Sequence, residues 1–193
     1  RPAAGHAAAG VGGAAAAGWV WWRLPAPAAR NLAFADLIEP DPPDAPWHPA
    51  AQTARLIAMT SPVNRRKFDR LAGAESVAYA AGYRRTRPDG AGGRAQRLEL
   101  RLDGLAGCLR TPAGGSSRQI VFEGRGGAVR SRLLSPREAA RLMGLPEDYR
   151  LPPAYNEACR LLGDGVVAAV ARHLARHLFA PLAAAARPAQ AAA

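Results

Sequence analysis

The chain contains few lysines, cysteines and aromatic residues, and it has no long hydrophobic run. Lys67 is its only lysine, so arginine carries almost all of its positive charge. The two cysteines, Cys108 and Cys159, have no CxxC spacing, which predicts a reduced, cytoplasmic protein without a disulfide framework. No apolar stretch approaches the ~20 residues that span a bilayer, and no signal peptide is recognisable. We therefore expect a soluble protein with no membrane partner.

Positive charge is in large excess. The formal net charge is +11 and the isoelectric point is near 11.2. This favours a polyanionic partner, nucleic acid first, because clustered arginines release counterions from phosphates. A GC-rich genome also enriches Ala, Arg, Gly and Pro, so codon bias is an alternative source of part of the charge. Between residues 84 and 132, however, eleven arginines stand against four acidic residues, which makes this segment the expected contact region.

The first 45 residues read as connecting chain. Residues 1–18 are rich in Ala and Gly without apolar periodicity, which is typical of a linker. One helical turn is expected over 34–38, before a run of prolines. A helix is predicted over 51–59, and Ser61 opens a second one as N-cap, with proline at the first helical position.

Residues 97–134 are predicted to form antiparallel strands. Three leucines alternate with charged residues from 97 to 102, the period of a strand with one buried face. Residues 119–123 and 128–133 form a second candidate pair around a glycine-rich turn. The preceding stretch, 84–90, ends in Pro-Asp-Gly and reads as turn-like.

Helix signals dominate after residue 134. Ser135 and Glu138 have the spacing of a capping box, and Gly144 is expected to end that helix. A last helix is predicted over 166–182, with an apolar stripe that needs a partner surface, formed by Val166, Val170, Leu174 and Leu178. Residues 183–193 are expected to be a disordered tail.

Three segments carry a family resemblance. SPREAARLMGLP at 135–146 closely resembles the ninth motif of the DNA (cytosine-5) methyltransferase family, and LGDGVV at 162–167 resembles its last motif. CLRTPAGGSSRQ at 108–119 looks like the loop-bearing part of the family's target-recognition domain. The resemblance covers residues 19–182, and three matches in the right order are far more specific than one.

The resemblance implies a divided protein. In this family a doubly wound α/β catalytic domain binds S-adenosylmethionine and a smaller domain reads duplex DNA. The target cytosine is flipped out of the duplex and attacked by a Cys from a Pro-Cys loop, assisted by a Glu. Here neither cysteine follows a proline, and neither a Glu-Asn-Val motif nor a Phe-x-Gly-x-Gly loop occurs. We therefore expect no catalytic residue in this chain, and weak or no cofactor binding by it alone.

The resemblance places the DNA contacts in one loop and its flanks. Glycines let a backbone approach phosphate, Ser, Thr and Arg bind phosphate or base edges, and Gln can pair with adenine. The expected contacts are Arg110, Thr111, Gly114, Gly115, Ser116, Ser117, Arg118 and Gln119. A solvated hairpin turn is the alternative. Arg84, Arg85 and Arg87 are candidate phosphate contacts beside this loop, with a solvated turn face as the alternative.

The family's cofactor-contacting loop corresponds here to Gly163, Asp164, Gly165 and Val166. Asp164 stands where the family usually has Asn, so a carboxylate that only accepts hydrogen bonds replaces an amide. That carboxylate can still accept from the cofactor's ammonium. The alternative is helix punctuation by two glycines and an N-capping Asp. His173 and His177 have the i, i+4 spacing of zinc ligands, but the Glu of that motif is missing and arginines flank them, so no metal is predicted.

These patterns together predict an α+β fold. A small antiparallel β target-recognition domain, residues 46–134, follows the linker 1–45. Residues 135–182 carry the last two motifs and a C-terminal helix that packs on a missing doubly wound α/β catalytic domain.

The expected function is DNA recognition in a bacterial cytosine-5 methyltransferase of a restriction-modification or regulatory setting, on the nucleoid when bound to DNA. Its expected partners are duplex DNA and the catalytic region, in cis or on a separate chain. A non-enzymatic DNA-binding module or a remnant of such an enzyme is the alternative. A basic RNA-binding protein is disfavoured because Phe122 alone is a poor supply of stacking positions on the sheet.

Overall fold

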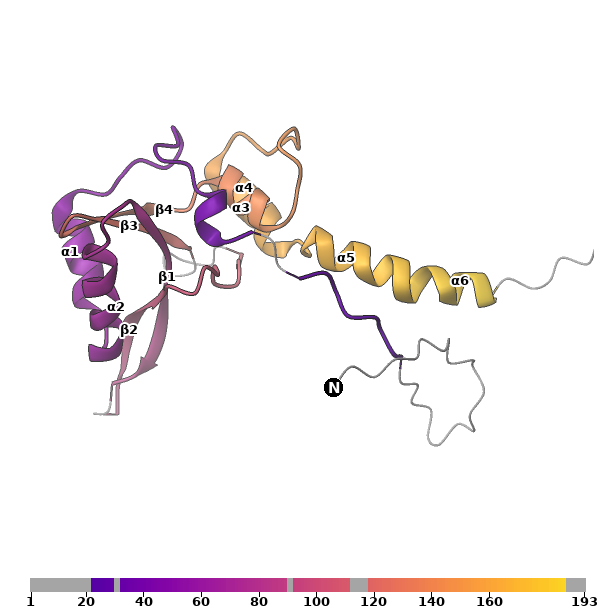
Figure 1. Cartoon of the computed structure of the whole chain (residues 1–193), viewed down its shortest axis with the longest axis horizontal. Helices are drawn as coiled ribbons and strands as arrows, with labels where there is room; N and C mark the ends of the chain where they lie inside the picture. The colour runs from indigo at the N-terminus through magenta and orange to yellow at the C-terminus, as the bar shows by residue number, and fades with distance from the viewer. Residues whose placement is uncertain (1–21, 30–31, 90–91, 112–117, 187–193) are drawn as a thin grey trace, which may run out of the picture. The chain divides into compact units, whose positions relative to one another are not determined.

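The computed structural model of the chain describes residues 22–29, 32–89, 92–111 and 118–186. It divides into two units, residues 30–169 and residues 1–29 with 170–193. The first unit contains a four-stranded sheet of order β2-β1-β3-β4 (Figure 1). Its strands, all paired antiparallel, are β1 (Ala78–Pro88), β2 (Arg94–Arg101), β3 (Ile120–Arg125) and β4 (Ala128–Leu133). The expected α+β class and the hairpin of β3 and β4 are confirmed.

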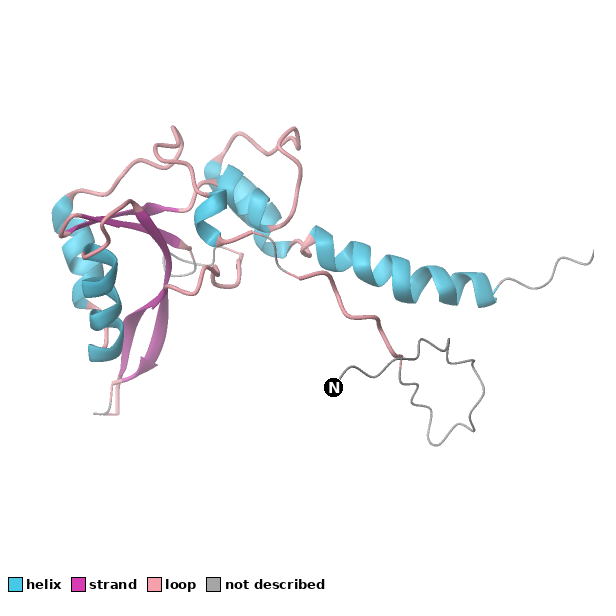
Figure 2. Ribbon diagram, in the orientation of Figure 1, coloured by secondary structure: helices cyan, strands magenta, loops and turns pink. Residues whose placement is uncertain are grey.

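Helices cover both faces of this sheet (Figure 2). On one face lie α1 (Ala50–Ala58) and α2 (Pro62–Ala72), packed on a cluster of Leu56, Phe68, Leu71, Ala80, Leu98, Leu100, Ile120 and Phe122. On the other lie the 3-10 turn η1 (Phe34–Leu37), α3 (Pro136–Leu142) and α4 (Tyr155–Asp164), around Phe34, Ala81, Val121, Leu134, Ala139, Ala140, Met143 and Leu162. Successive residues of one strand enter opposite clusters, as the pleat requires.

The predicted helix starts are confirmed in detail. The Ser61 hydroxyl accepts from the backbone N–H of Asn64, with Pro62 at the first position of α2. Ser135 accepts from the N–H of Glu138, and the Glu138 carboxylate accepts from the N–H of Ser135. Both arrangements satisfy amides that a helix N-terminus leaves unpaired. Gly144 follows α3 with a positive φ of 71°, the conformation that ends a helix at glycine.

Strand β3 and helix α2 approach each other closely at Gly124. A Cβ at this position would lie 2.1 Å from the backbone oxygen of Leu71, a separation that no side chain can adopt without moving the helix. Beside it, the rings of Phe68 and Phe122 meet edge to face with centroids 4.9 Å apart. Glycine at 124 therefore sets how near α2 sits to the sheet.

Both edge strands are covered. On β2, the N–H of Leu98 donates to the carbonyl of Met59 at 3.1 Å, and the N–H of Leu100 donates to Asn64 Oδ1 at 3.2 Å. The carbonyl of Leu100 accepts from Lys67 Nζ at 2.7 Å. Along β4, the backbone of residues 47–48 pairs with residues 131–132. These backbone N–H and C=O groups are therefore not free to pair with a strand of another molecule.

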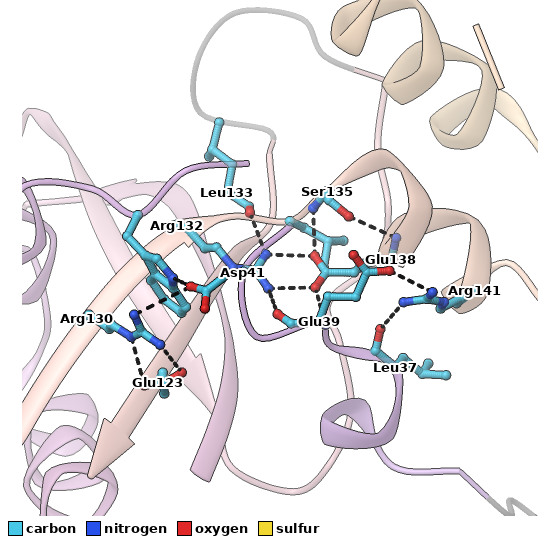
Figure 3. A network of polar contacts seen from close by, with 12 residues as sticks. Leu37, Glu39, Asp41, Glu123, Arg130, Arg132, Leu133, Ser135, Glu138 and Arg141 are labelled. Atoms are coloured by element: carbon cyan, nitrogen blue, oxygen red, sulfur yellow. Dashed lines mark hydrogen bonds and ion pairs between the residues drawn. The ribbon is translucent and has the colours of Figure 1, made fainter. Parts of the chain in front are cut away.

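A buried ion pair joins the sheet to α3 (Figure 3). The guanidinium of Arg132, in β4, donates to both oxygens of Glu138, at 2.6 and 2.8 Å, and both side chains are fully buried. Glu138 also accepts from the N–H of Glu39 at 2.8 Å, and Arg132 donates to the carbonyl of Glu39. Glu138 therefore ties α3 to β4 and to the chain at Glu39.

The C-terminal helix begins later and runs further than predicted. It comprises α5 (Ala168–Leu174), a π-helical segment η2 (Ala175–Phe179) and α6 (Ala180–Ala186), so residues 183–186 are helical. Pro181 does not end it. Because Pro181 has no N–H, the carbonyl of His177 lacks its usual helical donor, and Trp22 Nε1 donates to that carbonyl at 3.0 Å. The wide π turn and this indole together accommodate the proline.

One further expectation is corrected. Residues 84–88, read as turn-like, belong to β1, because β2 pairs with them throughout. Beyond α3, Tyr149 is 38% exposed, whereas Met143 is buried. In the part of the chain that the structure describes, no helix is long and apolar enough to cross a membrane.

Candidate nucleic-acid interface

A two-stranded ribbon extends from the sheet. Strands β1 and β2 pair from Ala81 opposite Arg101 to Pro88 opposite Arg94, but β3 pairs with β1 only as far as Gly82. Beyond Gly82, β2 is the only strand of the described residues that pairs with β1, so the two form a ribbon (Figure 2). The arginines predicted to flank the recognition loop therefore stand on a ribbon, an element that the major groove of DNA can admit.

One face of this ribbon combines arginines with an aromatic ring. Tyr83, Arg85 and Arg87 alternate along β1 and so share a face. Across the strand, Glu99 is opposite Tyr83 and Arg97 is opposite Arg85. The guanidinium of Arg85 lies 4.9 Å from the centre of the Tyr83 ring, and both Arg85 and Arg87 have side chains that are 49% exposed. The face therefore presents accessible positive charge in a defined arrangement.

Glu99 partly neutralises this face. Its carboxylate accepts from Arg87 Nη2 at 2.7 Å and lies 3.7 Å from Arg85 Nε. Burial acts to raise the pKa of Glu99, but hydrogen bonds from Arg87 and Tyr83, together with the charges of Arg85 and Arg87, outweigh burial and the pKa is lowered. Burial, with the hydrogen bond to Glu99, raises the pKa of Tyr83. Glu99 is therefore ionised at neutral pH and competes with any phosphate for these arginines.

Arg84 points to the opposite face of the ribbon. It alternates with Tyr83 and Arg85 along the strand, and its side chain is half-buried. Its Nε is buried and has no hydrogen-bond partner among the residues that the structure describes. Arg84 is thus separated from Arg85 and Arg87, with which the sequence had grouped it.

The base of the ribbon meets the segment predicted to bind DNA at Gly107. A Cβ at Gly107 would lie 2.8 Å from the Tyr83 ring and 2.8 Å from the amide of Gln119. Gln119 Oε1 accepts from the N–H of Gly107 at 3.1 Å, and its Nε2 donates to the carbonyl of Cys108 at 3.3 Å. Gln119 is only 6% exposed. Its amide, predicted to pair with adenine, instead holds the two ends of the segment together.

The remaining predicted contacts divide into three groups. Arg110 is exposed and Thr111 is half-buried. The Arg118 guanidinium donates to Asn156 Oδ1 and lies 5.4 Å from the centre of the Tyr155 ring, so α4 already engages it. Four further predicted contacts lie outside the described residues: Gly114, Gly115, Ser116 and Ser117.

The predicted cofactor residues lie at the end of α4. Gly163 and Asp164 are its last two residues, Gly165 is its C-cap, and Val166 is 69% exposed. The Thr111 hydroxyl donates to the Asp164 carboxylate. The structure thus brings the predicted cofactor loop against the predicted DNA-contact segment.

Two of these four residues, Gly163 and Asp164, fit a cofactor cradle poorly. Backbone occupies the place of a side chain at Gly163, because a Cβ there would lie 2.4 Å from Thr111 N and 2.5 Å from Arg110 C. One oxygen of Asp164 is bound to Thr111. Asp164 is not an N-cap either, since it belongs to the last turn of α4.

The described part of the chain holds no cluster of three or more His, Cys, Asp or Glu side chains that could bind a metal ion. The His173 and His177 rings lie with centroids 4.7 Å apart. Cys108 is exposed and Cys159 is half-buried in α4. Burial raises the pKa of the Cys159 thiol, which favours its neutral form.

Four residues of this region were not predicted from the sequence: Tyr83, Glu99, Tyr155 and Asn156. The period-two alternation of Tyr83 with Arg85 and Arg87 was the signal for the ribbon face. Nothing local indicated Tyr155 and Asn156, which belong to the region only through tertiary contact with Arg118.

Comparison with known proteins gives two matches. Residues 52–180 match the model of the C-5 cytosine-specific DNA methylase family. The type II methyltransferase M.HhaI of Haemophilus parahaemolyticus is 32% identical over 96 residues, which cover 48% of this chain and 28% of that protein. The chain thus spans less than a third of the length of this relative.

Proposed function

The chain belongs to the C-5 cytosine-specific DNA methylase family, and from that premise we propose that it is the DNA-recognising part of an enzyme that methylates C5 of cytosine in duplex DNA. The methyl donor is S-adenosylmethionine, and the transfer itself is carried out by protein outside these residues. One observation carries the proposal: the arginine face of the ribbon, Arg85, Arg87 and Arg97, adjoins the Cys108–Thr111 segment through Gly107.

The chemistry of this surface suits a phosphate backbone. Arginine binds phosphate through a planar fork of donors, and exposed arginines supply the counterion release that drives DNA binding. Arg85 and Arg87 lie on β1, and Arg110 is exposed on the segment that follows Gly107. Sequence reading belongs to the loop predicted at 114–117, while the ribbon supplies affinity and register.

The C-terminal helix supports the proposal that DNA recognition and methyl transfer lie on different parts of the enzyme. Val170 is 50% exposed and Phe179 is 59% exposed. Apolar side chains that are this exposed on a helix are ones that protein contact would cover. We propose that the catalytic region supplies that cover.

The first experiment measures binding of the full chain to a fluorescein-labelled duplex at several salt concentrations. Replacing both Arg85 and Arg87 by Gln removes two phosphate contacts, so the slope of log K against log salt becomes shallower by about 2. Arg65→Gln is the matched control, because Arg65 stands on α2, across the sheet from this face, with a 60% exposed side chain. Equal effects of the two changes, or no binding by the wild-type chain, would contradict the proposal.

Glu99→Gln gives a test of opposite sign. The variant keeps the shape of the side chain but removes the negative charge that competes for Arg85 and Arg87. DNA binding should tighten and its salt dependence should steepen. Weaker binding by this variant would place the DNA elsewhere.

Complementation tests the enzymatic half of the proposal. The chain alone should methylate no DNA. Mixing it with a separate chain that carries the catalytic region of the same enzyme should restore methylation of cytosine in duplex DNA. If the mixture forms a stable complex but stays inactive, the chain is a binding module instead.

A further inference from the structure

Gly163 is a glycine because another part of the backbone occupies the position of its side chain. The backbone of Arg110 and Thr111 lies within 2.5 Å of the place where a Cβ would stand, closer than any real contact of that atom. Its φ is not in the left-handed region, so conformational freedom does not explain it. Gly165, two residues on, differs: a Cβ there would meet its nearest neighbours at 3.3 and 3.4 Å.

Asp164 adds a polar contact to the same segment. The Thr111 hydroxyl donates to its carboxylate, a charge-assisted hydrogen bond. Both groups lie at the surface of the described chain, where Asp164 is exposed and Thr111 half-buried. Close approach at Gly163 and the bond at Asp164 therefore fix Arg110 and Thr111 against the C-terminal end of α4.

The opposite end of α4 holds Arg118. Its guanidinium donates to Asn156 and lies over the Tyr155 ring. Tyr155 is itself held, because its hydroxyl donates to the carbonyl of Leu134 at 2.8 Å. Residues 111 and 118 flank the predicted recognition loop, and one helix contacts both.

We propose that α4 is a positioning platform for the DNA-contacting segment. Gly163 and Asp164 fix Arg110 and Thr111, while Tyr155 and Asn156 fix Arg118. These four residues of α4 set DNA affinity without touching DNA. The inference rests on the proposed function and assigns Gly163 and Asp164 to the recognition segment instead of to the cofactor.

The glycine pair gives the first test, on the full chain with a fluorescein-labelled duplex of random sequence. Gly163→Ala forces the backbone of the segment to move, and binding should weaken by about ten-fold, the effect expected of moderate overpacking at a contact. Gly165→Ala needs a shift of only a few tenths of an ångström and should change binding less than about two-fold. Equal binding by the two variants overturns the proposal.

The Asp164 pair gives a second test that needs no backbone change. Asp164→Ala and Asp164→Asn remove the same negative charge, but only Asn keeps an oxygen that can accept from Thr111. If Asp164 were simply a surface charge, both variants would bind DNA more tightly and alike. The platform predicts that the Ala variant binds about three- to ten-fold more weakly than the Asn variant, the effect of one lost hydrogen bond.

A double-mutant cycle of Thr111 and Asp164 gives a third test. Thr111→Val should weaken DNA binding, whereas Thr111→Ser, which keeps the hydroxyl, should bind as the wild-type chain does. Thr111→Val combined with Asp164→Ala should bind DNA no more weakly than either single variant, because both changes remove the same hydrogen bond. Additive losses, or equal binding by Val and Ser variants, overturn the platform. A wild-type chain that binds no duplex overturns the proposed function instead, and thermal unfolding of each variant separates lost binding from lost fold.

Discussion

Removing the Glu138 carboxylate should strongly lower the folding stability of the unit formed by residues 30–169. Glu138 accepts from four donors: the two terminal nitrogens of Arg132, and the backbone N–H groups of Ser135 and Glu39. In Glu138→Gln one oxygen becomes an NH2 group that faces donors. The Arg132 charge stays fully buried and loses its counter-charge.

The expected cost follows from that geometry. Breaking a buried ion pair by removing one partner costs about 3–5 kcal/mol, a large share of the ~5–15 kcal/mol that stabilises a domain. For a unit of this size, that loss corresponds to a fall in melting temperature of roughly 10–15 °C. Thermal unfolding followed by circular dichroism measures the shift, and urea unfolding measures the free energy.

Two comparisons make the test sharp. Glu147→Gln also removes a carboxylate bound to an arginine, Arg141, but its side chain is 64% exposed, so its cost should stay below about 1 kcal/mol. Changing Arg132 and Glu138 together to Met and Leu should recover only part of the lost stability. No unpaired charge remains, but the N–H groups of Ser135 and Glu39 lose their acceptor. A loss at Glu138→Gln no larger than that at Glu147→Gln would refute the reasoning.

Two other predictions concern packing and pH. Gly124→Ala should destabilise the fold by at least about 1–3 kcal/mol in urea unfolding, because the added Cβ would lie 2.1 Å from the Leu71 backbone. Gly73→Ala is the control and should be close to neutral, because its added Cβ would have its nearest neighbour at 3.4 Å. Equal losses of stability in the two variants would contradict the close approach of α2 to the sheet. The hydrogen bond from Arg101 lowers the pKa of Asp103 to about 2 from 3.8, so its contribution to stability is complete above the unfolded value of 3.8 and is lost as pH falls through about 2. A carbon NMR titration of the carboxyl should have its midpoint near pH 2 and return toward 3.8 in Arg101→Gln; a midpoint near 3.8 in the wild-type chain would show that the ion pair does not form.

Local signals in the sequence were sufficient for much of the fold. The capping box at Ser135 and the N-cap at Ser61 are contained within four residues each, so the sequence alone predicts both helix starts. Strands β3 and β4 are joined by a glycine-rich turn and alternate regularly, which made their pairing predictable.

Strand β1 was missed because its pairing partners are remote. Ala78–Pro88 is rich in Ala, Gly and Arg, residues with little intrinsic strand preference, and it becomes a strand because β2 and β3 pair on its two sides. Pro181 could not be placed inside a helix from the sequence for the same reason, because the donor that satisfies the carbonyl of His177 comes from the distant Trp22. Tertiary contact decided both cases.

The candidate site was predictable as a list of residues but not as an arrangement. Arg110, Thr111 and the Gly163–Asp164 pair were all recognised from motifs, yet assigned to two separate ligands. Only the structure shows Thr111 bound to Asp164 and Gln119 turned inward. A motif records which side chains are present, while their partners across the chain decide what each can do.

The single lysine has a practical consequence. Because the amine of Lys67 donates to the carbonyl of Leu100 at the outer edge of β2, acylation of that amine would weaken one of the three contacts that cover this edge. Amine-directed labelling, cross-linking or immobilisation through Lys67 would therefore alter a protected strand edge. The exposed thiol of Cys108 is no neutral handle either, since it adjoins the segment proposed to meet DNA.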